Sequence, residues 1–105
     1  MLATYQQEPV LLAFTAINCG PCKLQKRELL SVRRMLGEQM MGDNLTMLAI
    51  DTEKWPQVGS RFQVRKLPCL VVVRDKEVLL RMEGLTKAED IAAQLRAYLE
   101  TSSGP

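Results

Sequence analysis

The sequence contains no histidine, and this absence excludes several kinds of active site. Zinc sites of histidine and cysteine, Ser–His–Asp and Cys–His catalysis, and imidazole pH switches all need that side chain. An excess of charge of one sign is also missing, because 14 Lys and Arg against 12 Asp and Glu leave a formal net charge of +2. This balance is far from the basic excess of a dedicated nucleic-acid binder. Charge therefore suggests no partner.

Long hydrophobic runs and export signals are missing as well. The start of the chain lacks a basic region, and the apolar run from Val10 to Ala16 is too short and too broken for a signal or membrane segment. We therefore expect a cytoplasmic protein that contacts neither membranes nor nucleic acid. The 3 cysteines are too few for a disulfide-stapled secreted scaffold, and two of them form the motif Cys19-Gly20-Pro21-Cys22. This cysteine usage indicates thiol chemistry rather than stapling.

Length and composition predict one globular domain. The chain has 105 residues, of which 47% are hydrophobic and 25% charged, as in ordinary soluble domains. No internal repeat, low-complexity tract or linker interrupts it before the last few residues. We expect a single domain over residues 1–100, followed by a disordered tail over residues 101–105.

The first half of the chain predicts a strand, a helix and a second strand. Val10–Thr15 is a continuous apolar run, which predicts a central strand buried on both faces. From residue 22 apolar residues recur every three or four positions, which predicts a long amphipathic helix with Asn18 as its N-cap and Gly37 or Gly42 at its end. Leu45–Ile50 is predicted to be a second inner strand. A strand, helix and strand in this order form a right-handed unit with parallel strands.

The second half predicts a short helix, an antiparallel hairpin and a closing helix. The hairpin turns at Asp75-Lys76, and Gly84 ends its second strand. The fold class is therefore α/β, with a mixed four-stranded sheet flanked by helices. The expected ranges are Thr52–Phe62 for the short helix, Cys69–Arg74 and Glu77–Met82 for the hairpin strands, and Lys87–Leu99 for the closing helix.

The two cysteines of the motif lie where a buried strand gives way to a helix. The free amide groups and partial positive charge of a helix N-terminus stabilise a thiolate, so Cys19 is predicted to be the reactive thiol with a lowered pKa. One helical turn places Cys22 close enough for a disulfide and shields it, so Cys22 is predicted to be the resolving thiol. The same spacing also builds zinc sites, but these need a second ligand pair, and only Cys69 is left. The remaining alternative is two unconnected structural cysteines.

From about Pro9 to Leu99 the chain resembles the thioredoxin family. The specific signal is the Cys-Gly-Pro-Cys motif within this order of elements. The residues that carry the resemblance are Phe14, Cys19-Gly20-Pro21-Cys22-Lys23, Asp51, Leu67-Pro68, the hairpin and Gly84.

This resemblance implies a fold, a site and a reaction. Pro68 is expected to be a cis-proline against the active-site disulfide, and the backbone of Leu67 is expected to pair with a bound substrate, with Asn18 and Gly84 as further substrate contacts. The reaction implied is dithiol–disulfide exchange, in which Cys19 attacks a protein disulfide and Cys22 releases the reduced substrate. Gly20-Pro21 between the cysteines is typical of reducing members. No cofactor or metal is implied; a reductase would donate electrons, and we expect a monomer.

Several residues depart from the family pattern. Ala13 stands where a buried Asp is usual, and Met47 where its partner Lys is usual, so neither can assist proton transfer at the resolving cysteine. Losing both charges together is consistent, because removing one alone would leave a buried unpaired charge. We therefore expect slow release of the mixed disulfide. Asn18 replaces the usual Trp, and the short N-terminus predicts four strands only.

The surroundings of the motif leave two questions open. Cys69, directly after Pro68, is either a third thiol near the motif or a small buried core residue, and we favour the core residue. Arg65, Lys66 and Glu83 stand where the family has small or apolar residues, and either change substrate preference or are ordinary solvated charges.

Three functions are compatible with the sequence. The leading one is a cytoplasmic protein-disulfide reductase. The second is a thioredoxin-fold adaptor that binds a partner and uses its cysteines as a redox latch, and the third is an exported disulfide oxidant or isomerase. Turnover on a disulfide-linked protein separates the first from the second, and the reduction potential separates it from the third.

Overall fold

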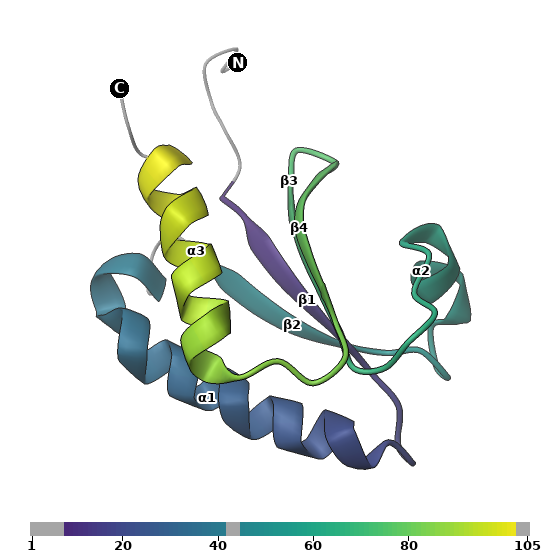
Figure 1. Cartoon of the computed structure of the whole chain (residues 1–105). Helices are drawn as coiled ribbons and strands as arrows, with labels where there is room; N and C mark the ends of the chain where they lie inside the picture. The colour runs from purple at the N-terminus through teal and green to yellow at the C-terminus, as the bar shows by residue number, and fades with distance from the viewer. Residues whose placement is uncertain (1–7, 42–44, 103–105) are drawn as a thin grey trace.

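The computed structural model describes residues 8–41 and 45–102 and confirms the predicted α/β fold. It contains one sheet of four strands, with a parallel pair and an antiparallel hairpin, and helices on both faces (Figure 1). The elements in chain order are β1 (Val10–Thr15), α1 (Gly20–Met41), β2 (Thr46–Asp51), α2 (Pro56–Arg61), β3 (Cys69–Arg74), β4 (Glu77–Glu83) and α3 (Ala88–Ser102).

The strand order is β2-β1-β3-β4, which makes β1 a central strand, as predicted. β1 runs parallel to β2, with Ala13 opposite Ala49, and antiparallel to β3. The prediction that the second strand lies inside the sheet differs from the structure, because among the described residues β2 is at an edge and Leu48 on it is 48% exposed. The apolar run in β2 indicates a strand. Whether a further strand pairs with its outer edge depends on residues that are distant in the sequence.

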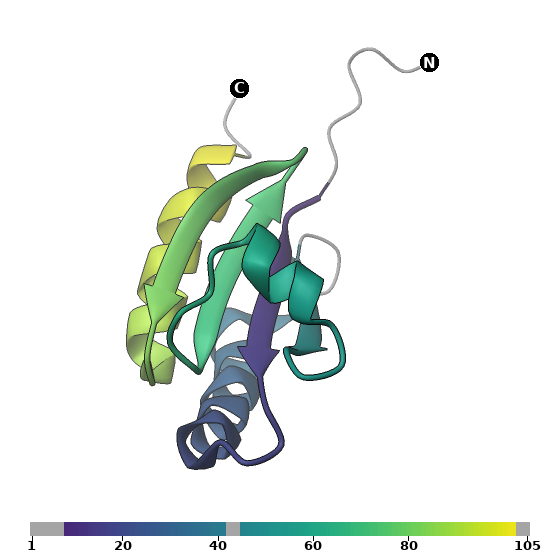
Figure 2. The same cartoon turned by 90° about the vertical axis from the view of Figure 1, so that its right-hand side faces the viewer.

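The helices divide between the two faces of the sheet (Figures 1 and 2). α1 and α3 pack side by side on one face and cover the larger core, in which Leu11, Leu70, Ile91 and Leu95 have no exposed surface. α2 lies on the other face, over a smaller core that includes Phe14. Burial of these large apolar side chains is the main force that holds the layers together.

Helix boundaries differ from the predictions in two places, the start of α1 and the end of α3. α1 begins at Gly20, so Cys19 and not Asn18 precedes its first residue, and Asn18 is exposed. The end of α1 agrees with the prediction of Gly37 or Gly42, because Gly37, with φ 74°, interrupts the helix and its last residue is Met41. α3 extends to Ser102, two residues into the segment expected to be a disordered tail, and residues 103–105 lie outside the described part.

Two turns that follow from the sequence are present. Asp75 and Lys76 connect β3 to β4 with φ values of 52° and 71°, as in the two-residue turn that matches the twist of a hairpin. Gly84 ends β4 with φ 80°, a conformation that glycine adopts without strain. Within the described residues no helix has the length and apolar character needed to cross a membrane.

Candidate active site

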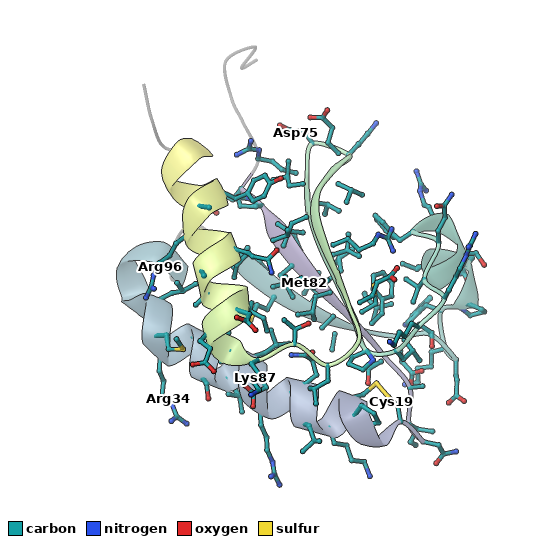
Figure 3. The ribbon with its side chains drawn as sticks, in the orientation of Figure 1. Cys19, Arg34, Asp75, Met82, Lys87 and Arg96 are labelled. Atoms are coloured by element: carbon teal, nitrogen blue, oxygen red, sulfur yellow. A yellow bond between two sulfur atoms is a disulfide. The ribbon has the colours of Figure 1, made fainter. Side chains whose placement is uncertain are left out.

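The register of the sheet brings three separate segments to one end of the molecule. Phe14 in β1 is opposite Cys69 in β3, and Cys69 is opposite Glu83 in β4. The residues just beyond these positions therefore meet, and the Gly84 N–H donates a hydrogen bond of 2.8 Å to the Pro68 carbonyl. The Leu67–Pro68 peptide bond is cis, as the resemblance implied. The disulfide at the start of α1 lies at this end of the fold (Figure 3).

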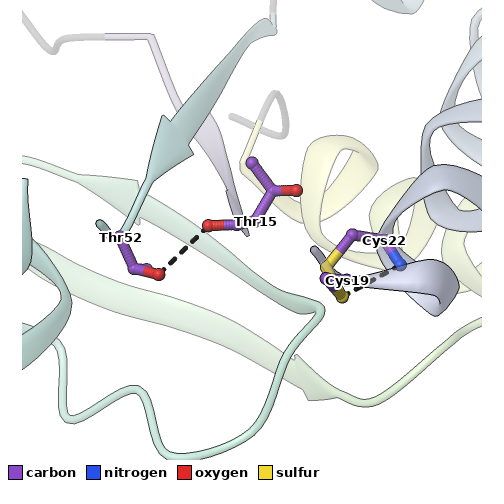
Figure 4. Close-up of a disulfide and its surroundings, with 4 residues drawn as sticks. All are labelled: Thr15, Cys19, Cys22 and Thr52. Atoms are coloured by element: carbon purple, nitrogen blue, oxygen red, sulfur yellow. Dashed lines mark hydrogen bonds between the residues drawn. A yellow bond between two sulfur atoms is a disulfide. The ribbon is translucent and has the colours of Figure 1, made fainter. Parts of the chain in front are cut away.

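Cys19 and Cys22 form a disulfide across the first turn of α1 (Figure 4). Their Cα atoms are 5.3 Å apart, which one helical turn provides without rearrangement of the backbone. The Cys22 N–H donates to the Cys19 Sγ over 3.2 Å, so Cys19 occupies the capping position that was predicted for Asn18. Cys22 is only 6% exposed, whereas Cys19 is partly exposed. This difference suits Cys19 to attack an external disulfide and Cys22 to act afterwards.

A cavity of about 280 Å³ lies behind the buried sulfur. Ala13 and Cys22 both line it, so the two side chains border the same space. The residues that line the cavity include two lysines, Lys23 and Lys26, but no carboxylate. Met47 packs against the larger core instead. The lining residues therefore include no carboxylate that could accept the Cys22 proton.

The rim of the site combines exposed apolar and charged side chains. Ile17, in the loop before Asn18, is 70% exposed, and Leu85, directly after Gly84, is 47% exposed. Neither residue was predicted to belong to the site, although each is next to a predicted substrate contact in the sequence. The Lys66 side chain approaches Gly84 so closely that a Cβ added there would lie 3.3 Å from its Cε. The backbone edge of Gly84 thus borders on a positive charge.

Hydrogen bonds hold the end of β1, the strand that precedes the Cys19–Cys22 motif, in place. The Thr15 carbonyl at the end of β1 accepts one bond from the Thr52 N–H (2.9 Å) and one from the Thr52 hydroxyl (3.1 Å) (Figure 4). Asp51 accepts a bond of 2.9 Å from the Glu53 N–H, which stabilises the turn into α2. These contacts fix the position from which the loop to Cys19 begins.

Cys69 is a free thiol with no exposed surface. It packs with Leu12, Phe14 and Val71 in the smaller core and is not among the residues that line the cavity behind Cys22. Burial raises the pKa of the Cys69 thiol, and the nearby Arg81 guanidinium, 3.9 Å from the sulfur, opposes this shift only in part. A buried, protonated thiol is a poor nucleophile, so these observations favour the core residue over the third thiol.

Replacing Cys69 with Ser is therefore expected to leave the redox chemistry unchanged. The oxidised protein should still contain one disulfide, between Cys19 and Cys22, because Cys69 is fully buried in the smaller core and does not line the cavity that Cys22 lines. Alkylation under native and denaturing conditions, followed by mass spectrometry, measures the species present. A shift in the distribution of oxidised species in Cys69→Ser would instead identify Cys69 as an exchanging third thiol.

Gln25 is a residue of the site that the sequence analysis missed. It follows Cys22 by three positions on the buried face of α1, lines the same cavity and is only 2% exposed. A polar residue on the apolar face of a predicted helix was the signal that could have found it.

The thioredoxin family model matches residues 2–97 of this chain. A thioredoxin-like protein of the cyanobacterium Synechocystis is 33% identical over 92 residues, which cover 88% of this chain and 83% of that protein. Chloroplastic thioredoxin X of Arabidopsis thaliana is 41% identical over 98 residues, covering 89% of this chain and 47% of the relative. Chloroplastic thioredoxin Y of rice is 30% identical, with 91% and 54% covered. The chain thus spans about half the length of these two chloroplast relatives.

Solved structures agree with these matches. Chloroplastic thioredoxin z superposes with a TM-score of 0.70 at 29% identity, covering 90% of this chain and 80% of that one. A mutant thioredoxin of Halobacterium salinarum gives a TM-score of 0.70 at 28% identity, with 89% and 76% covered.

Proposed function

The chain belongs to the thioredoxin family and is a thiol–disulfide oxidoreductase, and from this premise we propose that Cys19 is its nucleophile and Cys22 its resolving thiol in the reduction of protein disulfides. The observation that carries this assignment is the unequal exposure of the two cysteine residues at the start of α1. The more accessible sulfur also receives the Cys22 N–H, which would stabilise its thiolate.

The proposed reaction transfers two electrons from the dithiol to the substrate. The Cys19 thiolate attacks one sulfur of a substrate disulfide, the substrate S–S bond breaks, and the departing thiolate takes up a proton. Cys22 then loses its proton and attacks the Cys19 sulfur. This step breaks the mixed disulfide, releases the second substrate thiol and leaves the Cys19–Cys22 disulfide that the structure contains.

Substrate contacts are proposed for the residues around the disulfide. Leu67 offers its backbone next to Pro68, Gly84 borders the same edge, and Asn18 is exposed in the loop before Cys19. Gly20 and Pro21, both exposed between the cysteines, complete the surface that a substrate would meet. An external reductase would restore the dithiol. We propose that the protein acts in the cytoplasm and as a monomer.

The reduction potential of the Cys19–Cys22 pair tests the proposed direction of electron transfer. Equilibration in graded thiol–disulfide buffers, followed by counting of alkylated cysteines by mass, gives the value. We expect a potential near roughly −270 mV, as for a reductant of the thioredoxin type. A value near roughly −180 mV or above would make the protein an oxidant or isomerase and would overturn the cytoplasmic assignment.

A second candidate, a redox-latched adaptor, is favoured by the absence of a carboxylate from the cavity behind Cys22. An adaptor would bind its partner and exchange disulfides only once, because its mixed disulfide would not be released. Repeated turnover of a disulfide-linked test protein, with dithiothreitol as electron source, supports the reductase. Stoichiometric reaction without turnover supports the adaptor.

A further inference from the structure

Gln25 and Glu28, three positions apart on α1, both form hydrogen bonds with the segment from the end of β4 to the start of α3, and Gln25 follows Cys22 by three positions. Gln25 is the only polar or charged side chain that is fully buried among the residues the structure describes, at 2% exposure. Burial of a carboxamide is unfavourable unless its donors and acceptor are paired.

Both ends of the Gln25 carboxamide bond to the backbone of a single residue far away in the sequence, Thr86. Its Nε2 donates to the Thr86 carbonyl over 2.9 Å, and the Thr86 N–H donates to its Oε1 over 2.9 Å. One turn further along α1, the Glu28 carboxylate accepts a bond of 2.7 Å from the Ala88 N–H at the start of α3. These side chains of α1 therefore hold residues 84–88, which we call the strap, against the helix that carries the disulfide.

The other end of the strap is joined to the cis-proline. The Gly84 N–H donates to the Pro68 carbonyl over 2.8 Å, and the Thr86 hydroxyl donates to the Gly84 carbonyl over 3.1 Å. Hydrogen bonds thus run without a break from Gln25 through Thr86 and Gly84 to Pro68. Since Cys22, Gln25 and Pro68 also line one cavity, this path encloses the buried side of the disulfide.

We propose that Gln25 is a positioning residue that sets the strap for protein substrates. It is buried, so it acts through Thr86 and not by touching the substrate. The strap carries Leu85, whose side chain is 47% exposed and is suited to contact an extended protein segment beside the disulfide. A small disulfide needs only the Cys19 sulfur, so its reduction does not depend on the strap. This inference rests on the proposed function.

The test replaces Gln25 with Met, which keeps the length and fills the space but removes both hydrogen bonds. The matched control is Arg27→Met, which places the same residue on the exposed side of the same helix. For Gln25→Met, kcat/KM toward a disulfide-linked test protein is expected to fall about tenfold or more, because small misplacements of binding groups have effects of this order. Its rate with dithiobis(nitrobenzoate), a small aromatic disulfide, is expected to change less than about twofold. Arg27→Met should match the wild type with both substrates.

Two outcomes of the comparison between the two disulfide substrates contradict the proposal. Equal losses with both disulfides would show that Gln25 supports the whole site, and unchanged rates with both would show that the strap is held without it. Hydrogen exchange of the wild-type Thr86 amide needs no variant, and we expect strong protection relative to an unfolded chain. Unprotected exchange at Thr86 would also overturn the inference. Failure of wild-type turnover on the test protein would instead refute the proposed reductase, and the exchange result would still report whether Gln25 holds the strap.

Discussion

Cys22→Ser is expected to turn the protein into a trap for its substrates. The Cys19 thiolate can still attack a substrate disulfide, but a hydroxyl at position 22 cannot break the mixed disulfide, so the covalent complex accumulates. Turnover of a disulfide-linked test protein should fall about a thousandfold or more, as expected when one member of a catalytic unit is removed. Non-reducing electrophoresis and mass spectrometry detect the complex as a species that dithiothreitol removes.

Cys19→Ser is the matched control for this trap. Cys22 is only 6% exposed, so it is expected to form little mixed disulfide on its own. Equal trapping by both variants would contradict the assigned roles, since it would make the two sulfurs equally accessible to substrate. More trapping by Cys19→Ser than by Cys22→Ser would reverse the roles.

Ala13→Asp is expected to accelerate the release of the mixed disulfide. Ala13 and Cys22 line the same cavity of about 280 Å³, which contains no carboxylate and has space for one. A carboxylate there can accept the Cys22 proton, and proton transfer by a positioned group contributes a factor of roughly 100 or more. Stopped-flow measurement of thiol release from a preformed mixed disulfide gives this rate.

The same substitution should lower stability. Burial favours the neutral form of a carboxyl in this cavity and raises its pKa above the unfolded value, although Lys23 and Lys26, which also line the cavity, oppose this shift. Above the folded-state pKa the buried charge lowers the free energy of unfolding by about 1–3 kcal/mol. This loss of stability is relieved as the pH falls below that pKa. Urea unfolding at pH 7 and pH 5 measures this difference. Ala13→Asn is the control, because it adds similar volume without a base, and faster release in Ala13→Asn would show that shape and not proton transfer limits the step.

The sequence by itself determined the local elements and the redox motif. The apolar run of Val10–Thr15, the turn at Asp75-Lys76 and the break at Gly84 are properties of short segments, and the structure contains each of them where it was predicted. The cysteine pair could be placed at a strand-to-helix junction because its spacing and the change in hydrophobic period are also local signals. The resemblance added the cis bond before Pro68, which no local signal would have justified.

Other features were decided only by the tertiary structure. β2 is an edge strand because no other described strand pairs along its outer side, and nothing within Leu45–Ile50 encodes that. The Gln25 carboxamide finds its partners at Thr86, 61 positions away, so its role depends on how α1 packs beside α3. Cys69 faces the smaller core because the register of β3 against β1 sets the direction of its side chain. Short segments encode their own conformation, whereas pairing, burial and long-range hydrogen bonds depend on which segments the folded chain brings together.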